Sequence, residues 1–123
     1  MPNSKKRKNT SASQYGFDKL KKAAVFGDYK QMSKLLLNKF IDPNACSVEN
    51  GFTALMYAAA VGQVKIVKLL LNDQRVSINK KDNRNVMTAI EFAKENGNNE
   101  IENLLMSAKE KGNNEIENPL MSA

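Results

Sequence analysis

A spacing of 35 residues recurs along most of this chain and limits what it can fold into. Three sets of positions at that spacing hold identical residues: Gly27, Gly62 and Gly97; Ala23, Ala58 and Ala93; Leu35, Leu70 and Leu105. Chance would give one or two such matches at a single offset, but not the whole set. The chain therefore contains three repeats, and repeats of this length bury their apolar faces by stacking on one another.

The middle repeat, GFTALMYAAAVGQVKIVKLLL, predicts two helices joined by a tight turn. Thr53 precedes the first apolar stretch, where its hydroxyl can cap the first helical turn, and Asp18 and Thr88 occupy the equivalent positions. Gly62 predicts the end of this helix, because glycine adopts the left-handed conformation at low cost. A second helix over residues 64–72 is apolar on most of its surface, as expected for a helix between neighbouring repeats.

The composition excludes several kinds of site. The 123 residues include one cysteine, Cys46, and no histidine. An intramolecular disulfide, a Cys/His zinc site and a Cys/His or Ser/His catalytic pair therefore cannot form. No spacing of the remaining titratable groups suggests catalysis. We expect a protein that is not an enzyme and that has no cofactor, no metal and no small-molecule substrate.

The apolar middle repeat does not predict a membrane span. Gln63, Lys65 and Lys68 interrupt it, and each lysine at the centre of a span would cost roughly 2.5–3.5 kcal/mol on insertion scales. The basic start of the chain is followed by polar residues, so no signal peptide is expected. These features favour a soluble, cytoplasmic protein without a membrane partner.

The net charge of +6 is concentrated near the amino terminus. Residues 1–12, which we expect to form a disordered tail, contain one basic run that consists of Lys5, Lys6, Arg7 and Lys8. Such a run fits a nuclear import signal or a contact with nucleic-acid phosphates, and the nucleus would then be the location. A solvated tail without function is the alternative. The rest of the chain is nearly balanced in charge, so nucleic acid could be a partner only through this tail.

A second and shorter repetition lies at the carboxyl terminus. AKENGNNEIENLLMS, over residues 93–107, recurs as AKEKGNNEIENPLMS over residues 108–122. In the second copy Pro119 replaces a leucine and obstructs a helix. We therefore expect residues 108–123 to be a frayed helix or disordered.

The repeated unit resembles the ankyrin repeat. The middle repeat is similar to that family's G-x-T-P-L-H-x-A-A-x-x-G-x-x-x-I-V-x-L-L-L core, with Ala54 in place of the proline and Met56 in place of the histidine. The resemblance implies an all-α solenoid of helix–turn–helix units with projecting loops, over residues 13–107. Its three units would span about residues 13–47, 48–82 and 83–107. Loss of the histidine is expected to remove a hydrogen bond between adjacent repeats.

The resemblance also implies function, because ankyrin repeats bind other proteins through their loop tips and the exposed side of the first helix of each repeat. On that basis another protein is the expected partner, and its identity is open. The matching positions in this sequence are Phe17, Val25, Phe26, Glu49, Asn50, Phe52, Val61, Arg84, Asn85 and Met87.

Three of these residues form a pattern of their own. Phe17, Phe52 and Met87 are one period apart and stand beside the start of each first helix. If the stack forms, they predict an apolar row on its concave side, where exposed aromatic residues usually mark a partner surface. The alternative is that each side chain folds back onto its own helix as a hydrophobic staple.

Overall fold

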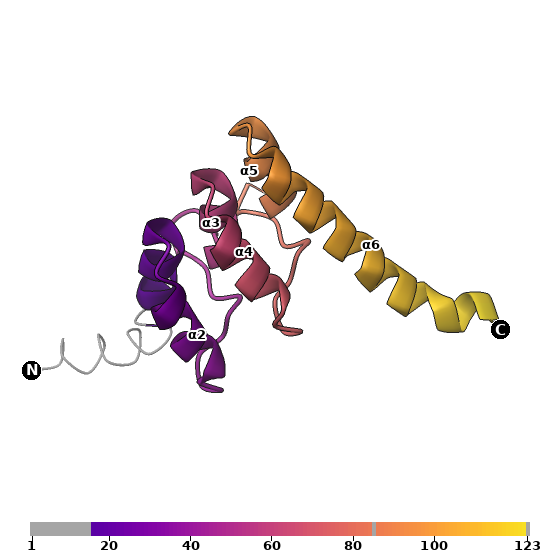
Figure 1. Ribbon diagram of the computed structural model, residues 1–123, viewed down its shortest axis with the longest axis horizontal. Coiled ribbons are helices and arrows are strands. Elements are labelled where there is room, and N and C mark those ends of the chain that lie inside the picture. Colours follow the sequence, from indigo (N-terminus) through magenta and orange to yellow (C-terminus); the bar gives the residue numbers. More distant parts are fainter. Residues whose placement is uncertain (1–15, 85, 123) are drawn as a thin grey trace, which may run out of the picture.

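The computed structural model describes residues 16–84 and 86–122, with side chains described as far as Lys111. This part of the chain contains six helical segments and no extended strand (Figure 1). They are residues 16–26, α2 (Tyr29–Leu37), α3 (Ala54–Val61), α4 (Val64–Leu71), α5 (Ala89–Glu95) and α6 (Asn99–Ser122). Within the described residues no helix is long and apolar enough to cross a membrane.

The helices form three pairs that stack side by side (Figure 1). The second helices α2, α4 and α6 make one layer, in which α4 packs against both α2 and α6. The first helices make the other layer, in which α3 packs against α5. This arrangement confirms the predicted all-α repeat solenoid.

Glycine ends the first helix of each pair because of its backbone conformation, and at the junctions between repeats also because it has no side chain. Gly27, Gly62 and Gly97 have φ values of 70°, 95° and 71°, in the left-handed region that other residues adopt only at a cost. A Cβ atom at Gly27 would also lie 2.6 Å from the side chain of Gln63 in the next repeat. At Gly97, which has no repeat after it in the described structure, a Cβ would meet nothing within 4 Å.

Two of the three predicted helix caps are present. The Thr53 hydroxyl accepts a hydrogen bond from the Met56 N–H at 3.3 Å, and Thr88 directly precedes α5. The prediction for Asp18 was wrong, because Asp18 lies inside the helix over residues 16–26. Thr53 is held extended by an isolated β-bridge to Cys46, whereas the position equivalent to Cys46 in the first repeat lies outside the described residues.

The core runs along the whole stack between the two helical layers. It combines alanines on the first helices with longer aliphatic side chains on the second helices, which lets the layers approach closely. The largest fully buried side chains are Leu20, Met32, Met56, Ile66, Val67, Leu70, Ile101 and Leu105. Every repeat contributes to this set, so no repeat could bury its apolar face alone.

The first repeat presents charged residues where the inner repeats use apolar or amide side chains. Lys22 occupies the position of Tyr57, and Asp28 occupies the position of Gln63. Tyr57 contacts an aromatic ring of the preceding repeat, and Gln63 donates a hydrogen bond to a backbone carbonyl of that repeat. Lys22 and Asp28 are instead exposed at the amino-terminal end of the stack.

The last repeat is polar at its outward face in the same way. Lys94 and Glu102 stand at the positions of Ala59 and Val67, which are both fully buried in the middle repeat. In the last repeat they line a shallow hollow of about 340 Å³ at the carboxyl-terminal end of the stack. Its other lining residues are Ile90, Met106, Lys109 and Glu110.

Helix α6 is much longer than the other second helices. It covers both the last repeat and the duplicated segment, and it runs on past the body of the stack (Figure 1). Pro119 falls within its bounds, so the backbone of α6 has no break there. The predicted domain boundaries, and the frayed or disordered state of residues 108–123, stay predictions.

Candidate protein-binding surface

The predicted apolar row is not an exposed surface. The side chain of Phe17 is 3% exposed and that of Met87 is 8% exposed, so for these two residues the prediction of a solvent-facing row was wrong. Phe52 is half-buried. Its ring lies 4.9 Å from the ring of Phe92 in the next repeat, between centroids, and the Phe17 ring lies 6.3 Å from that of Tyr57. The Phe52 ring also lies 5.6 Å from that of Tyr57 on its own first helix, so Phe52 forms the staple within its repeat as well as a contact with the next repeat.

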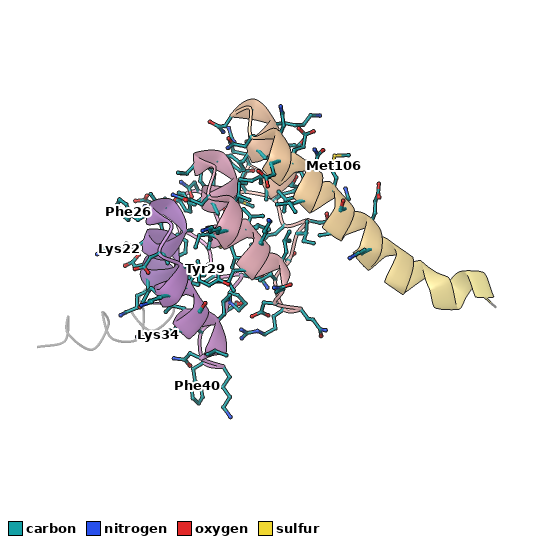
Figure 2. The ribbon with its side chains drawn as sticks, in the orientation of Figure 1. Lys22, Phe26, Tyr29, Lys34, Phe40 and Met106 are labelled. Atoms are coloured by element: carbon teal, nitrogen blue, oxygen red, sulfur yellow. The ribbon has the colours of Figure 1, made fainter. Side chains whose placement is uncertain are left out.

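A second periodic pair does lie on the surface. Phe26 is 76% exposed and Val61 is 51% exposed, at equivalent positions near the ends of the first helices. Tyr57 lies one helical turn before Val61 and is half-buried, with the Lys21 ammonium 5.2 Å from its ring centroid. We call the surface formed by Phe26, Tyr57 and Val61 the first-helix face. Figure 2 shows Phe26 at the outer edge of the first repeat.

The loop residues predicted as contacts lie beside the start of the first helices. Glu49 and Arg84 are exposed and Asn50 is half-buried, whereas Asn85 lies outside the described residues. The Asn83 N–H donates to the Asn50 carbonyl at 2.8 Å, so the two loops are connected. Val25, the other predicted contact, is half-buried, and its carbonyl accepts a bond from the next repeat.

Two exposed valines in these loops were missed from the sequence. Val48 is 77% exposed and Val86 is 56% exposed. Each is the single large apolar residue in a polar turn, within SVENG and NRNV respectively. An apolar residue at a position that the fold does not bury was the signal that could have identified them.

Asp82 organises the second loop from a buried position. One carboxylate oxygen accepts hydrogen bonds from the Val86 N–H at 3.1 Å and the Met87 N–H at 3.3 Å. The other oxygen pairs with the Arg84 guanidinium at 2.7 Å. Desolvation by burial raises the pKa of Asp82, but these donors outweigh it and hold the pKa below its ordinary value.

Side-chain amides replace the lost histidine link between repeats. Gln63 donates to the Val25 carbonyl at 3.0 Å, and Asn98 donates to the Ala59 carbonyl at 2.6 Å. Gln63 and Asn98 are one period apart, so the same contact occurs at both junctions between repeats. The amides of Gln63 and Asn98 therefore supply a hydrogen bond between repeats in place of the one whose loss was expected. The sequence pattern did not identify this position.

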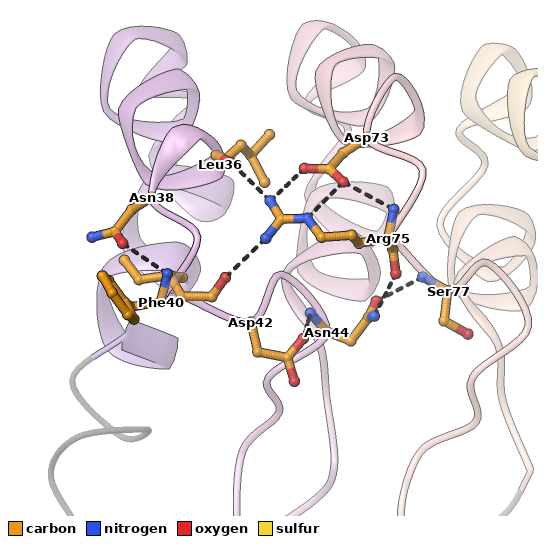
Figure 3. Close-up of polar contacts among 9 residues, drawn as sticks. Leu36, Asn38, Phe40, Asp42, Asn44, Asp73, Arg75 and Ser77 are labelled. Atoms are coloured by element: carbon orange, nitrogen blue, oxygen red, sulfur yellow. Dashed lines mark hydrogen bonds and ion pairs between the residues drawn. The ribbon is translucent and has the colours of Figure 1, made fainter.

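A guanidinium also links the first two repeats at the opposite side of the stack (Figure 3). Arg75 donates to the Leu36 carbonyl at 2.7 Å and to the Ile41 carbonyl at 3.4 Å. It is paired with Asp73 at 2.7 Å, and the hydrogen bonds from Arg75 hold the pKa of Asp73 below its ordinary value. Asn44 completes the junction by accepting from the Ser77 N–H at 2.6 Å.

The described residues offer no cluster of three or more His, Cys, Asp or Glu side chains that could hold a metal ion. The basic run Lys5, Lys6, Arg7 and Lys8 lies outside the described residues. Nothing in the part of the chain with described coordinates supports the nuclear or nucleic-acid alternative. The geometry of that part consists of rigid repeats with apolar side chains at particular edges, which is suited to contact with another macromolecule.

The family comparison agrees with this geometry. A family model described as "Ankyrin repeats (3 copies)" matches residues 5–82, more than half of the chain. The match ends before α5 and α6, which the structure shows as the third helix pair in the same stack. No curated protein matches the chain. The repeat spacing, the stacked helix pairs and the matching family model together show that the chain belongs to the ankyrin repeat family.

Proposed function

We propose that this protein recognises another protein through the first-helix face and through the loop residues Glu49 and Arg84, which lie beside the start of the first helices. Ankyrin repeats are in general modules for protein–protein interaction and are typically non-catalytic. The observation that carries the proposal is the pair of large apolar side chains, Phe26 and Val61, exposed at equivalent positions of adjacent repeats.

The fold itself does not require apolar residues there. The third repeat has Asn96 at the position of Phe26 and Val61, and its first helix still packs in the stack. Exposed apolar side chains that packing does not explain usually belong to a partner surface. The hydrogen bonds of Gln63 and Asn98 hold adjacent repeats together, so the face is held rigid and little conformational entropy would be lost on binding.

The test begins by isolating the partner with the full chain as bait and measuring its affinity for purified protein. We expect Phe26→Ser together with Val61→Ser to weaken that affinity about tenfold or more, as loss of an apolar anchor does. The matched control is Leu37→Ser with Phe40→Ser, which removes one phenylalanine and one aliphatic residue from a different exposed site. Circular dichroism should show both variants folded. Equal affinity of the wild type and the first variant would contradict the proposal.

A further inference from the structure

The end of α2 and the short turn after it, which we call the Leu37–Phe40 turn, expose two large apolar side chains. Leu37 is 85% exposed and Phe40 is 88% exposed, which makes them the most exposed large apolar residues among those described. The equivalent positions of the other repeats hold polar residues. These are Asn72 and Arg75 in the second repeat, and Ser107 and Glu110 in the third. The fold therefore does not need apolar residues there, and their exposure calls for another explanation.

The turn is held in one conformation by hydrogen bonds at both ends (Figure 3). The Asn38 side chain accepts from the Phe40 N–H at 2.9 Å, and the Asn38 carbonyl accepts from the Ile41 N–H at 3.0 Å. Arg75 of the next repeat donates to the carbonyls on either side of the turn, those of Leu36 and Ile41. Two apolar side chains on a turn fixed in this way can be buried by a partner at a small entropic cost.

Exposed lysines accompany these apolar side chains along α2 and in the turn. Lys30, Lys34 and Lys39 are exposed on α2 and in the turn, and the Lys39 ammonium lies 6.0 Å from the Phe40 ring centroid. Asp28, Asp42 and Asp73 also lie in this region, Asp73 beside Leu37 and paired with Arg75, so the lysines leave it a small excess of positive charge. Figure 2 shows Lys34 and Phe40 toward the same end of α2, with Phe40 at the tip.

We propose that the Leu37–Phe40 turn and its flanking lysines dock on an anionic lipid surface. Amphipathic segments bind bilayers by burying apolar side chains at the headgroup boundary while lysines face anionic lipids. A projecting turn fits this occupant, because a bilayer closes around it without a preformed groove. The proposal is independent of the first-helix face, so either surface can fail without the other.

The test measures co-sedimentation of the full chain with vesicles of phosphatidylcholine containing about 30 mol % phosphatidylserine. We expect binding to these vesicles, little binding to pure phosphatidylcholine, and a decrease with added salt. Leu37→Ser with Phe40→Ser should lower the partition coefficient about tenfold or more. Phe26→Ser with Val61→Ser is the matched control and should bind as the wild type does.

Two further variants separate the charge of this region from the charge of the whole chain. Lys34→Glu with Lys39→Glu should abolish binding, whereas Lys94→Glu with Lys109→Glu, which makes the same change in charge at the other end of the stack, should retain most of it. A chain lacking residues 1–12 should bind more weakly but keep its dependence on Phe40, because the basic run adds charge without apolar anchors.

A fluorescent reporter then tests insertion directly. The protein has no tryptophan, so Phe40→Trp introduces a single one. Its emission should shift to shorter wavelength with anionic vesicles, while that of Val48→Trp should not. An unshifted emission from Phe40→Trp on vesicle-bound protein would overturn the proposal. So would equal vesicle binding by the wild type and the Leu37→Ser, Phe40→Ser variant, or saturable capture of an acidic protein by the turn without vesicle binding.

Discussion

Single side chains join one repeat to the next in this protein. Gln63 and Asn98 each donate to a carbonyl near the end of the preceding first helix. The glycines Gly27 and Gly62 leave the space in which these amides lie, because a Cβ atom at either would approach the amide. Repeat junctions of this kind depend on a pair of positions, a glycine in one repeat and an amide in the next.

Two glycines with the same backbone conformation allow the junction to be tested. Gly27→Ala and Gly97→Ala should both destabilise the fold by about 1–2 kcal/mol, because both place a Cβ in the left-handed region. Gly27→Ala should cost about 1 kcal/mol more, since its Cβ would also displace the Gln63 amide. Urea unfolding measures both changes. Equal costs would show that the Gln63 contact contributes nothing to stability.

Asp82 makes the stability of the second loop dependent on pH. Its pKa is lower in the folded protein than in the unfolded chain, so its contribution is present above an unfolded pKa of about 3.9 and is lost as the pH falls through the folded value. We expect Asp82→Asn to be less stable than the wild type at pH 7. The difference in thermal midpoint between them should shrink in acid. A difference that stays constant from neutral to acid pH would contradict the inferred pKa shift.

The positions of these residues could be predicted only in part. The 35-residue spacing predicts that Gly27 and Gly62 end helices and that Thr53 begins one, because these roles depend on local backbone geometry. The spacing did not predict that Phe17 and Met87 are buried, because burial between repeats depends on side chains from the neighbouring unit. The Phe17 ring packs near Tyr57, 40 positions later in the chain, and no local pattern identifies that contact.

Among the helices, the first of each pair contributes mainly buried alanines to the core, and the second contributes longer buried aliphatic side chains. The approximate limits of the first helices could be predicted from the sequence, since glycine and the capping residues mark where these helices begin and end. The length of α6 could not be predicted from the sequence. We expected Pro119 to obstruct a helix, whereas α6 continues past this residue. Among the side chains of α6 that the structure describes, those of Ile101 and Leu105 are fully buried and anchor the helix in the core.

The two parts of α6 should therefore differ in importance. Deleting residues 112–123 should change the free energy of unfolding by less than about 0.5 kcal/mol, because the second copy of the 15-residue repetition has no first helix of its own to pack against. Leu105→Ala should cost about 2–5 kcal/mol, as removal of a buried leucine usually does. Urea unfolding of both proteins checks this contrast. A large loss of stability on deletion would mean that the extension packs on the repeats.

At the scale of the whole molecule, both ends of the stack present polar residues, and we expect these residues to limit self-association. Lys94 and Glu102 replace residues that are fully buried in the middle repeat, and they place charge on the face that a further repeat would have to cover. Burying those charges without partners would be costly, so the end face stays in water. Terminal repeats with a polar outer face keep a repeat protein soluble.

Removing that polarity should make the protein associate. We expect Lys94→Ala with Glu102→Val, which restores the residues found at Ala59 and Val67, to form dimers or larger species at concentrations where the wild type sediments unchanged. Sedimentation velocity measures this directly. Lys65→Ala with Glu49→Val, at exposed positions away from the end, is a matched change that likewise removes one cation and one acid. Association of both variants to the same extent would mean that the charges of the end face do not limit association.

The polar ends also bear on how such a chain can lengthen during evolution. A new unit can be accommodated between two existing repeats, where both of its faces meet apolar and amide partners. A unit added after the last repeat would meet Lys94 and Glu102 instead. The 15-residue duplication at the carboxyl terminus fits this restriction, because its product is a longer α6 and not a fourth helix pair.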